Sequence, residues 1–346
     1  MTITGKTYPS PKGEITHYTL TNDKGSSVTL STLGAGIVAI NVPDANGALA
    51  NVVLGYDDAA SWIADGPCAG KIPGRFANRI ARGHFTLDGK EYTLAINNGP
   101  NALHGGPEGF QNQIWDARTV GDNKVVMVYA AEDGEEGYPG NLIVTAEYTW
   151  DNDDTLTLRL HATTDAPTVI NLTNHVYFNL DGEGSGSVLG HKLRLNAACY
   201  LPTDPTQIPT GEIAPVAGTP MDFRDFKEIG KDIEADFEPL KIGKGYDHCW
   251  VVDDYRKGEM REVAVLKAAK SGRTLTVATT QPGMQIYTGN WLKGCPRSIS
   301  GGDYNDYDGV AIECQNFPDA PNKPEFPTPV LRPGEEYDET IKFSFK

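Results

Sequence analysis

"LIVTAEYTWDNDDTLTLRLHATT", residues 142–164, decides the fold class of this chain. Two runs rich in β-branched residues alternate apolar with polar positions, and the turn-forming residues DNDD separate them. An alternation with a period of two is typical of a strand that buries one face. The stretch therefore predicts two strands joined by a turn.

Runs of the same kind recur along the whole chain, with turn signals such as "DANG" and "DGK" between them. Examples are "KVVMVYAA" (124–131), "KLRLNAACYL" (192–201) and "TLTVATT" (274–280). Helical periodicity is scarce, and "DDAASWIAD" (57–65) is the best short candidate. The pattern predicts an all-β fold, an antiparallel sandwich or barrel. Because no repeat, linker or shift in composition divides the chain, we expect one domain over residues 1–346.

The composition excludes several classes of partner. A net charge of −16 argues against nucleic acid, which requires clustered lysine and arginine. No apolar run approaches the roughly 18 residues of a membrane span, so we expect no membrane association. The first residues, "MTITGKTYPSPKGE", contain no apolar signal core, and we expect a cytoplasmic protein. Nothing in the composition demands an oligomer, so a monomer or a weak homodimer is expected.

The cysteines and histidines show no metal-binding pattern. The five cysteines are scattered and never spaced as CxxC, so we expect free thiols in a reducing compartment. The seven histidines include no HExxH or similar spacing. We therefore expect neither a metal nor any other cofactor.

A second stretch, "INLTNHVYFNL" at residues 170–180, sorts into two faces at a period of two. One face is apolar except for Asn174 and belongs in a core. The other consists of uncharged hydrogen-bonding groups around one histidine: Asn171, Thr173, His175, Tyr177 and Asn179. Such a face is either solvated or suited to a neutral, hydroxyl-rich ligand. The stretch predicts a strand with one of these two uses.

Polar groups suited to the same kind of ligand lie in two stretches nearer the N-terminus. "GRFANRIARGHF" (74–85) places Asn78 and Arg79 among glycines. "NNGPNALHGGPEGF" (97–110) places His104 before a Gly-Gly turn, where we expect backbone to approach a ligand closely.

Three later stretches add strand-borne candidates. "GYDHCWVV" (245–252) has Asp247 at the entrance to an apolar strand, and "GMQIYTGNW" (283–291) alternates Gln285 and Tyr287 with apolar residues. "GVAIECQNFPDA" (309–320) contains Glu313 in an otherwise apolar run. A glutamate in such a strand is either paired with an arginine such as Arg79 or functional.

Six motifs, in order, resemble the galactose mutarotase (aldose 1-epimerase) family. They are "GRFANRI", "LHGG", "NLTNHVYFNL", "GYDH", "TTQPGMQIYTGNW" and "ECQNFPDAPNKPEFPTPVLRPGEEY". The resemblance covers about residues 15 to 344 and departs from the family at Val176, where serine is usual, and at Cys314, where threonine is usual. Val176 falls on the apolar face, so we expect it not to alter the chemistry. The resemblance implies a large antiparallel β-sandwich.

The resemblance also implies the activity and the site: interconversion of the α and β anomers of a free monosaccharide. Glu313 matches the general base and His175 the general acid of the family. The positions that hold the sugar match Asn78, Arg79, His104, Tyr177, Asp247 and Gln285. Removing the proton of the C1 hydroxyl and protonating the ring oxygen opens the ring, and one carboxylate with one imidazolium suffices for both steps.

We expect the two catalytic groups to start in opposite protonation states. A free glutamate ionises near 4.3, so Glu313 is ionised at neutral pH, whereas a free histidine near 6.5 is mostly neutral. We expect the Asp247 carboxylate to raise the pKa of His175. Three alternatives stay open: a glycoside hydrolase using Asp247 and Glu313, a sugar-phosphate mutarotase, and a non-catalytic carbohydrate-binding protein. The preferred aldose is not fixed by the sequence.

Overall fold

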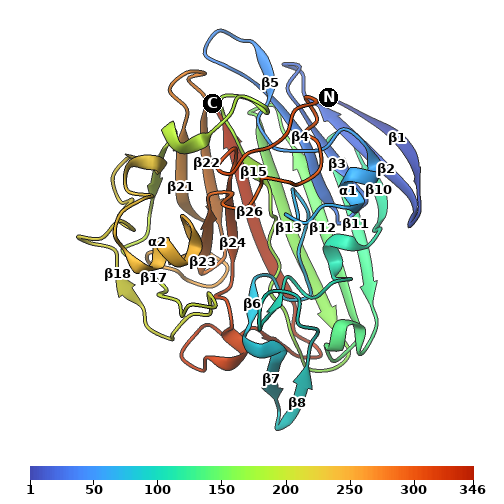
Figure 1. Ribbon diagram of the computed structural model, residues 1–346. Coiled ribbons are helices and arrows are strands. Elements are labelled where there is room, and N and C mark those ends of the chain that lie inside the picture. The colour runs from blue at the N-terminus through green and yellow to red at the C-terminus, as the bar shows by residue number, and fades with distance from the viewer.

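The computed structural model describes residues 1–346 and is built almost entirely of antiparallel strands (Figure 1). Its two α-helices are short, α1 (Ala59–Ile63) and α2 (Glu238–Gly243). Helix α1 confirms the helix expected within 57–65, and the Asp58 carboxylate caps it by accepting a hydrogen bond from the Ser61 backbone N–H at 2.7 Å. Neither helix is long and apolar enough to cross a membrane. The all-β expectation is confirmed.

The largest sheet has nine strands. In spatial order they are β10 (Asp116–Val120), β11 (Lys124–Ala131), β12 (Leu142–Trp150), β13 (Thr155–Thr164), β26 (Tyr337–Phe345), β22 (Thr274–Thr279), β21 (Arg261–Lys267), β16 (Lys192–Leu195) and β19 (Lys227–Glu228). The opening stretch, 142–164, supplies β12 and β13, which pair from Leu142 opposite Thr164 to Trp150 opposite Leu156. This hairpin confirms the two strands joined by a turn.

A six-stranded sheet carries the side chains that matter for function. Its order is β15 (Tyr177–Phe178), β24 (Val310–Gln315), β23 (Gly283–Tyr287), β20 (Asp247–Val251), β17 (Cys199–Tyr200) and β18 (Ala214–Pro215). Alternate residues of β24 point to opposite faces, so Ile312 and Cys314 enter the core while Glu313 points away from it. Met284 and Ile286 of β23 enter the same core and leave Gln285 on the face of Glu313.

The remaining strands form one larger sheet and three pairs. The five-stranded sheet runs β1 (Thr2–Ser10), β2 (Gly13–Thr21), β3 (Ser27–Ser31), β4 (Gly36–Pro43) and β5 (Leu49–Asn51). The pairs are β6 (Arg79–Ile80) with β9 (Ala102–Leu103), β7 (His84–Leu87) with β8 (Lys90–Thr93), and β14 (Thr168–Val169) with β25 (Val330–Leu331). Short 3-10 turns occupy Ala81–Gly83, Phe110–Asn112, Glu135–Gly137, Val188–Gly190, Ile229–Lys231 and Ala320–Asn322.

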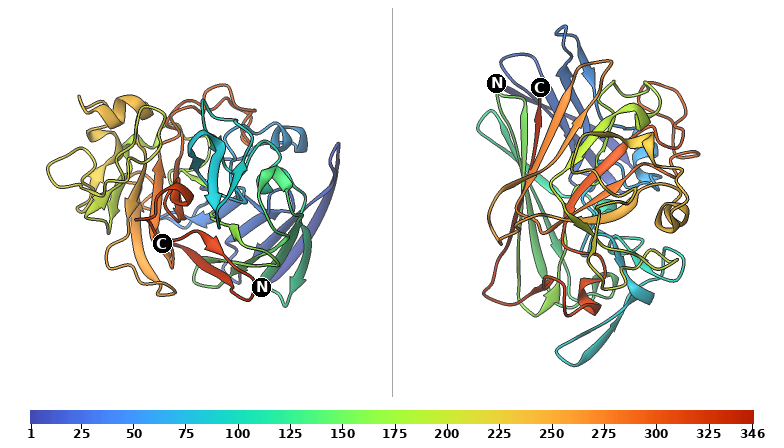
Figure 2. Two further views of the ribbon diagram at one scale, coloured as in Figure 1. Left: turned by 90° about the horizontal axis from the view of Figure 1, so that it is seen from below. Right: turned by 90° about the vertical axis from the view of Figure 1, so that its left-hand side faces the viewer.

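One continuous core joins the sheets. Apolar side chains from β3 and β4 to β26 belong to a single cluster of 58 buried residues. Seen from the side, the nine-stranded sheet extends along one edge of the molecule, and the six-stranded sheet lies with its loops on the other (Figure 2, right). Two layers of antiparallel sheet packed over a shared core make a β-sandwich. The other face of the six-stranded sheet carries Glu313, and Ala311 on this face belongs to a smaller cluster with Ile15 of β2 and Val38 of β4.

The stretch 170–180 departs from its prediction as a strand. Only Tyr177–Phe178 is paired as a strand, and every residue of the stretch is buried, on both faces. The Asn171 and Asn179 amides donate hydrogen bonds to loop carbonyls, those of Ala77 and Asn316 for Asn171 and those of Gly186 and Asp308 for Asn179. The polar face is therefore partly structural, because loops cross over it and take up its amides. Val176 lies in the core, as expected.

Candidate active site

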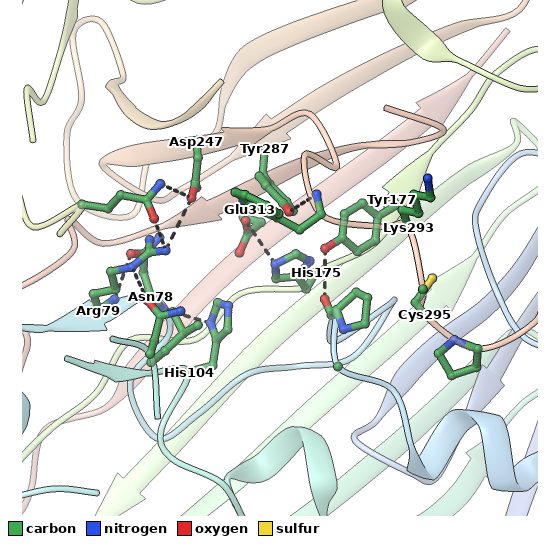
Figure 3. A pocket seen from close by; sticks show the side chains of 18 of the residues that line it. Asn78, Arg79, His104, His175, Tyr177, Asp247, Tyr287, Lys293, Cys295 and Glu313 are labelled. Atoms are coloured by element: carbon green, nitrogen blue, oxygen red, sulfur yellow. Dashed lines mark hydrogen bonds and ion pairs between the residues drawn. The ribbon is translucent and has the colours of Figure 1, made fainter. Parts of the chain in front are cut away.

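A cavity of about 620 Å³ lies over the face of the six-stranded sheet that carries Glu313 (Figure 3). It is lined by seven of the eight residues that the sequence singles out: Asn78, Arg79, His104, His175, Tyr177, Asp247 and Glu313. These residues come from segments as far apart as residues 78 and 313, which only the sheet topology brings together. The eighth, Gln285, does not line the cavity.

Glu313 and His175 form the centre of the cavity (Figure 3). The His175 Nε2 atom lies 3.5 Å from the Glu313 Oε1 atom, and the exposed fractions of the two side chains are 5% and 2%. Glu313 sits on β24, whose neighbour β23 fixes it in register opposite Gln285. His175 is held from the other side, since its backbone N–H donates to the Lys71 carbonyl. A buried acid and base at this distance can exchange a proton once they approach slightly or share one water molecule.

Burial changes the protonation of this pair from the expected one. It raises the pKa of Glu313 well above the usual value, with a further increase from the Asp247 carboxylate and an opposing effect of Arg79. It lowers the pKa of His175 to about 4, although Asp65 and Asp247 both act to raise it. Asp247 thus acts in the expected direction, but the pKa of His175 is lowered overall, because the loss of hydration outweighs the nearby negative charge. In the free protein the carboxyl is the preferred proton holder.

The position and the tautomer of the neutral His104 imidazole are fixed by Asn78, its neighbour across the β6–β9 strand pair. Strands β6 and β9 pair Arg79 with Leu103, which places Asn78 and His104 side by side. The Asn78 backbone N–H donates to the His104 Nδ1 at 3.1 Å, so Nδ1 is an acceptor and Nε2 carries the proton. Burial lowers the pKa of His104 well below its usual value, reinforced by His175 and Arg79. His104 therefore offers an N–H group to the cavity.

The two glycines after His104 pack very closely against the rest of the protein. A Cβ atom on Gly105 would lie 1.9 Å from the Gly74 carbonyl oxygen, and one on Gly106 would lie 2.1 Å from a Glu136 carboxylate oxygen. The turn can lie this close to the rest of the chain only because it has no side chains. The close contact of Gly105 is with backbone and that of Gly106 is with a side chain, and the expected close approach of a ligand stays a prediction.

Asp247 is the acceptor of a hydrogen-bonded network at one end of the cavity (Figure 3). Its carboxylate accepts hydrogen bonds from the Gln285 Nε2 at 2.6 Å and from the Gln207 Nε2 at 2.7 Å. Arg79 donates to the Gln207 Oε1 at 2.7 Å and, at 3.5 Å, to the Asp247 carboxylate. The arginine thus pairs with Asp247 and not with Glu313, so the structural interpretation of Glu313 as a partner for Arg79 fails.

Gln285 and Tyr177 take up different positions around the pair. Gln285 is buried behind Asp247, to which its amide donates, and reaches the cavity only through that carboxylate. Tyr177 lines the cavity, with its ring centroid 5.0 Å from that of His175 and its hydroxyl donating to the Pro67 carbonyl at 3.0 Å. Its hydroxyl oxygen keeps an acceptor site for a ligand.

Several lining residues were missed by the sequence analysis. They are Asn98, Gln207, Trp291, Lys293 and Cys295. Tyr287, which the sequence marks by its alternation with apolar residues in "GMQIYTGNW", shares a strand face with Gln285 and also lines the cavity. Gln207 lies in an irregular loop without periodicity, and no pattern marks it.

One donor set could accept a metal ion. His104, His175 and Glu313 each place one ligand atom within 4.8 Å of the others. Imidazole and carboxylate donors suit zinc. The absence of a metal requirement therefore stays a prediction. All five cysteines are free thiols.

An antiparallel β-sandwich with a buried carboxyl–imidazole pair in a cavity of amide, hydroxyl and N–H groups fits an enzyme of the acid–base type that acts on a hydroxyl-rich substrate. The aldose 1-epimerase family model matches residues 16–344. The chain is 44% identical over 337 residues to galactose mutarotase from Bos taurus, covering 97% of this chain and 96% of that one, and 40% identical over 336 residues to aldose 1-epimerase from Escherichia coli K12, covering 94% of each.

Solved structures agree with this match. An aldose epimerase homologue from C. elegans superimposes with a TM-score of 0.87 at 33% identity, covering 95% of this chain and 98% of that one. Galactose 1-epimerase from Lactobacillus acidophilus NCFM gives a TM-score of 0.87 at 29% identity, with 100% and 99% covered. The chain belongs to the aldose 1-epimerase family, and its activity is aldose 1-epimerisation, with a sugar as substrate.

Proposed function

We propose that Glu313 is the general base and His175 the general acid of this reaction, acting on free aldohexoses such as galactose and glucose. Glu313 takes the proton from the C1 hydroxyl while His175 protonates the ring oxygen. The C1–O5 bond then breaks, the aldehyde end rotates, and the ring closes on the other face. The observation that supports these roles is the 3.5 Å approach of His175 Nε2 to Glu313 Oε1 inside the cavity.

The starting state follows from the shared proton. The pair holds one proton in total, which burial favours on Glu313. Hydrogen bonds from sugar hydroxyls to the carboxylate favour its ionised form, and the proton then resides on the nearby imidazole. We propose that sugar binding prepares the acid and the base in this way. Each is expected to contribute on the order of 10² to 10⁴ in rate.

The sugar hydroxyls would be held by the groups around the pair. We assign this role to Asn78, Arg79, His104, Tyr177, Asp247 and Gln285. Asp247 and Arg79 offer an acceptor and a donor at one end, and His104 Nε2 offers a donor beside Glu313. Gln285 would act chiefly by orienting Asp247. Fixed donors and acceptors keep C1 and O5 aligned with the catalytic pair.

Galactose is a reasonable first substrate because relatives of similar length carry the name galactose mutarotase. Polarimetry tests the proposal. Freshly dissolved α-galactose and α-glucose should relax to anomeric equilibrium faster with protein than without. Glucose 6-phosphate should show little acceleration. If only the phosphate is accelerated, the protein is a sugar-phosphate mutarotase; if nothing is, it only binds carbohydrate.

We further propose a single-domain protein of residues 1–346, present as a monomer or a weak homodimer in the cytoplasm. A continuous core and a cavity lined by one chain support the first two points. Five free thiols suit a reducing compartment. Sedimentation over a range of concentrations and a single cooperative unfolding transition test the first two points, and fractionation of cells tests the third.

A further inference from the structure

Gln315 is a buried side chain that neither the fold nor the sugar site explains. It has no exposed surface, and neither its Oε1 nor its Nε2 has a hydrogen-bond partner within the protein. Buried polar atoms are nearly always paired, because an unpaired one forfeits its hydration without replacement. It does not line the cavity, so contact with the sugar does not account for it.

The strand register places Gln315 next to Glu313. The two residues are two positions apart on β24 and therefore share a face. On the neighbouring strand β23, Glu313 is opposite Gln285 and Gln315 is opposite Gly283. The Gln315 side chain thus stands beside the catalytic carboxyl, on the side away from the cavity.

The segment that carries His175 runs past the same residues. At one end, the Asn316 backbone N–H donates to the Asn171 side chain at 2.8 Å. At the other, His175 Nε2 lies 3.5 Å from Glu313 Oε1. Thr173 lies between these two contacts in the chain, and continuing the antiparallel register of β15 and β24, in which Tyr177 is opposite Ala311, would place it opposite Gln315. Its Oγ1 is also fully buried and has no partner within the protein.

Unpaired atoms therefore flank the catalytic carboxyl on both neighbouring segments of its sheet face, β23 and the stretch before β15. Besides those of Gln315 and Thr173, they include Gln285 Oε1 and Glu313 Oε2. A buried water molecule requires two to four polar partners, which this group supplies as both donors and acceptors. We propose that Gln315 is a positioning residue that, together with Thr173, holds buried water against the Glu313 carboxyl. This inference rests on the proposed role of Glu313 as the base.

The buried water would favour the ionised form of the Glu313 carboxyl. Gln315 Nε2 donates to the water, and the water donates to Glu313 Oε2. A donor on a carboxylate favours its ionised form. It also leaves Oε1 for His175 and the sugar. Gln315 thus helps Glu313 to give up its proton when the sugar binds.

Substituting Gln315 changes none of the ionisable groups around Glu313. Those groups are Arg79, Asp247, His104, His175 and Tyr177, with the thiols of Cys68, Cys249 and Cys314. A change in the pH dependence of a Gln315 variant consequently reports the contact to Glu313.

The test is Gln315→Met, which keeps the length of the side chain and removes its hydrogen-bonding atoms. We expect kcat to fall about tenfold, the effect of one hydrogen bond to a charged group, with KM changed less than about twofold. The acid limb of the kcat profile should move to higher pH, because Glu313 loses a donor to its ionised form. The matched control is Gln281→Met, a buried glutamine that donates to the Leu172 carbonyl and the Tyr337 hydroxyl outside the cavity. It should lower stability without moving that limb.

Thr173→Val provides a second measurement if Gln315→Met does not fold, and it should move the limb in the same direction. The inference is overturned if the variant that folds has its acid limb at the same pH as the wild type, or if Gln281→Met shifts the acid limb by the same amount. Glu313→Gln, measured in parallel, separates the two proposals. If Glu313→Gln is inactive but the acid limb of the Gln315 or Thr173 variant does not move, only the role of Gln315 fails. If Glu313→Gln is active, the role of Glu313 itself fails.

Discussion

The Nε2 atom of His175 lies 3.5 Å from the Oε1 atom of Glu313, with both side chains almost completely buried. Burial raises the pKa of the Glu313 carboxyl and lowers that of the imidazole to about 4. The neutral pair and the ion pair have the same net charge and differ only in where one proton lies. The active form is the singly protonated pair, whose two macroscopic pKa values belong to both groups.

This pair predicts a bell-shaped dependence of kcat/KM on pH. A second proton abolishes the base at low pH, near the lowered pKa of His175, and loss of the shared proton abolishes activity at high pH, above the usual range of a glutamate. Asp247 contributes to raising both pKa values because a negative charge favours the proton on either group. In Asp247→Asn both limbs should therefore move to lower pH, and KM should rise.

Polarimetry of Asp247→Asn across pH measures these shifts. Asp306→Asn is the control, since Asp306 pairs with Lys244 outside the cavity lining. It should leave both limbs in place. If the alkaline limb of Asp247→Asn does not move, Asp247 is only a sugar ligand.

Gln207 should matter for sugar binding more than for chemistry. Its side-chain oxygen accepts a hydrogen bond from Arg79 and its amide donates one to Asp247, so it orients both of these proposed sugar-binding groups. We expect Gln207→Leu to raise KM about tenfold, the effect of losing one hydrogen bond to a charged group, with kcat within about twofold. Steady-state kinetics decides this. Gln113→Leu is the matched control, because Gln113 donates to the Glu108 carbonyl away from the cavity. A fall in kcat at unchanged KM would contradict the assignment.

The wall of the cavity depends on a buried ion pair. Lys71 Nζ lies 3.1 Å from the Asp65 carboxylate, with exposed fractions of 1% and 0%, and also donates to the Trp62 carbonyl. We expect Lys71→Met to lower the free energy of unfolding by about 3–5 kcal/mol, because it leaves a buried charge unpaired. Denaturant unfolding measures this. The double variant Lys71→Met/Asp65→Asn should recover part of the loss, and full additivity of the two single changes would show that the groups do not interact.

We expect the reaction to proceed without a metal ion, because proton transfer by Glu313 and His175 is sufficient chemistry. Exhaustive chelation followed by polarimetry should leave kcat within about twofold of the untreated value, well short of the effect of removing a catalytic group. The test can contradict the prediction, because His104, His175 and Glu313 together could bind a metal ion. A large loss that one specific divalent ion restores would count against the mechanism.

Much of the sandwich could be predicted from local pattern. The alternation in 142–164 specifies β12 and β13, and that around Glu313 specifies which face of β24 is buried. The stretch 170–180 shows the limit of this reasoning. Its alternation is real, yet most of it is not paired as a strand, because loops from elsewhere in the chain bind its amides.

The residues of the site likewise differ in whether the sequence reveals them. Residues in motifs with distinctive chemistry, such as His175 and Glu313, could be named from the sequence. Gln207 could not, because its place depends on how an irregular loop folds over Arg79. The direction of the pKa shift of His175 cannot be predicted from the sequence, because a sequence suggests the nearby charge of Asp247 but not the depth of burial that outweighs it.

The central claim is that Glu313 is the general base, and Glu313→Gln tests it most directly. The amide keeps the shape of the side chain but cannot take the C1 proton, so kcat for mutarotation should fall by about 10² or more, while the affinity for sugar, measured by calorimetry, stays within about threefold. Glu339→Gln is the matched control, a buried glutamate outside the cavity whose pKa burial raises to about 7, and it should keep wild-type kcat. If Glu313→Gln retains more than about a tenth of the wild-type kcat, against the loss expected of a general base, Glu313 is not the base.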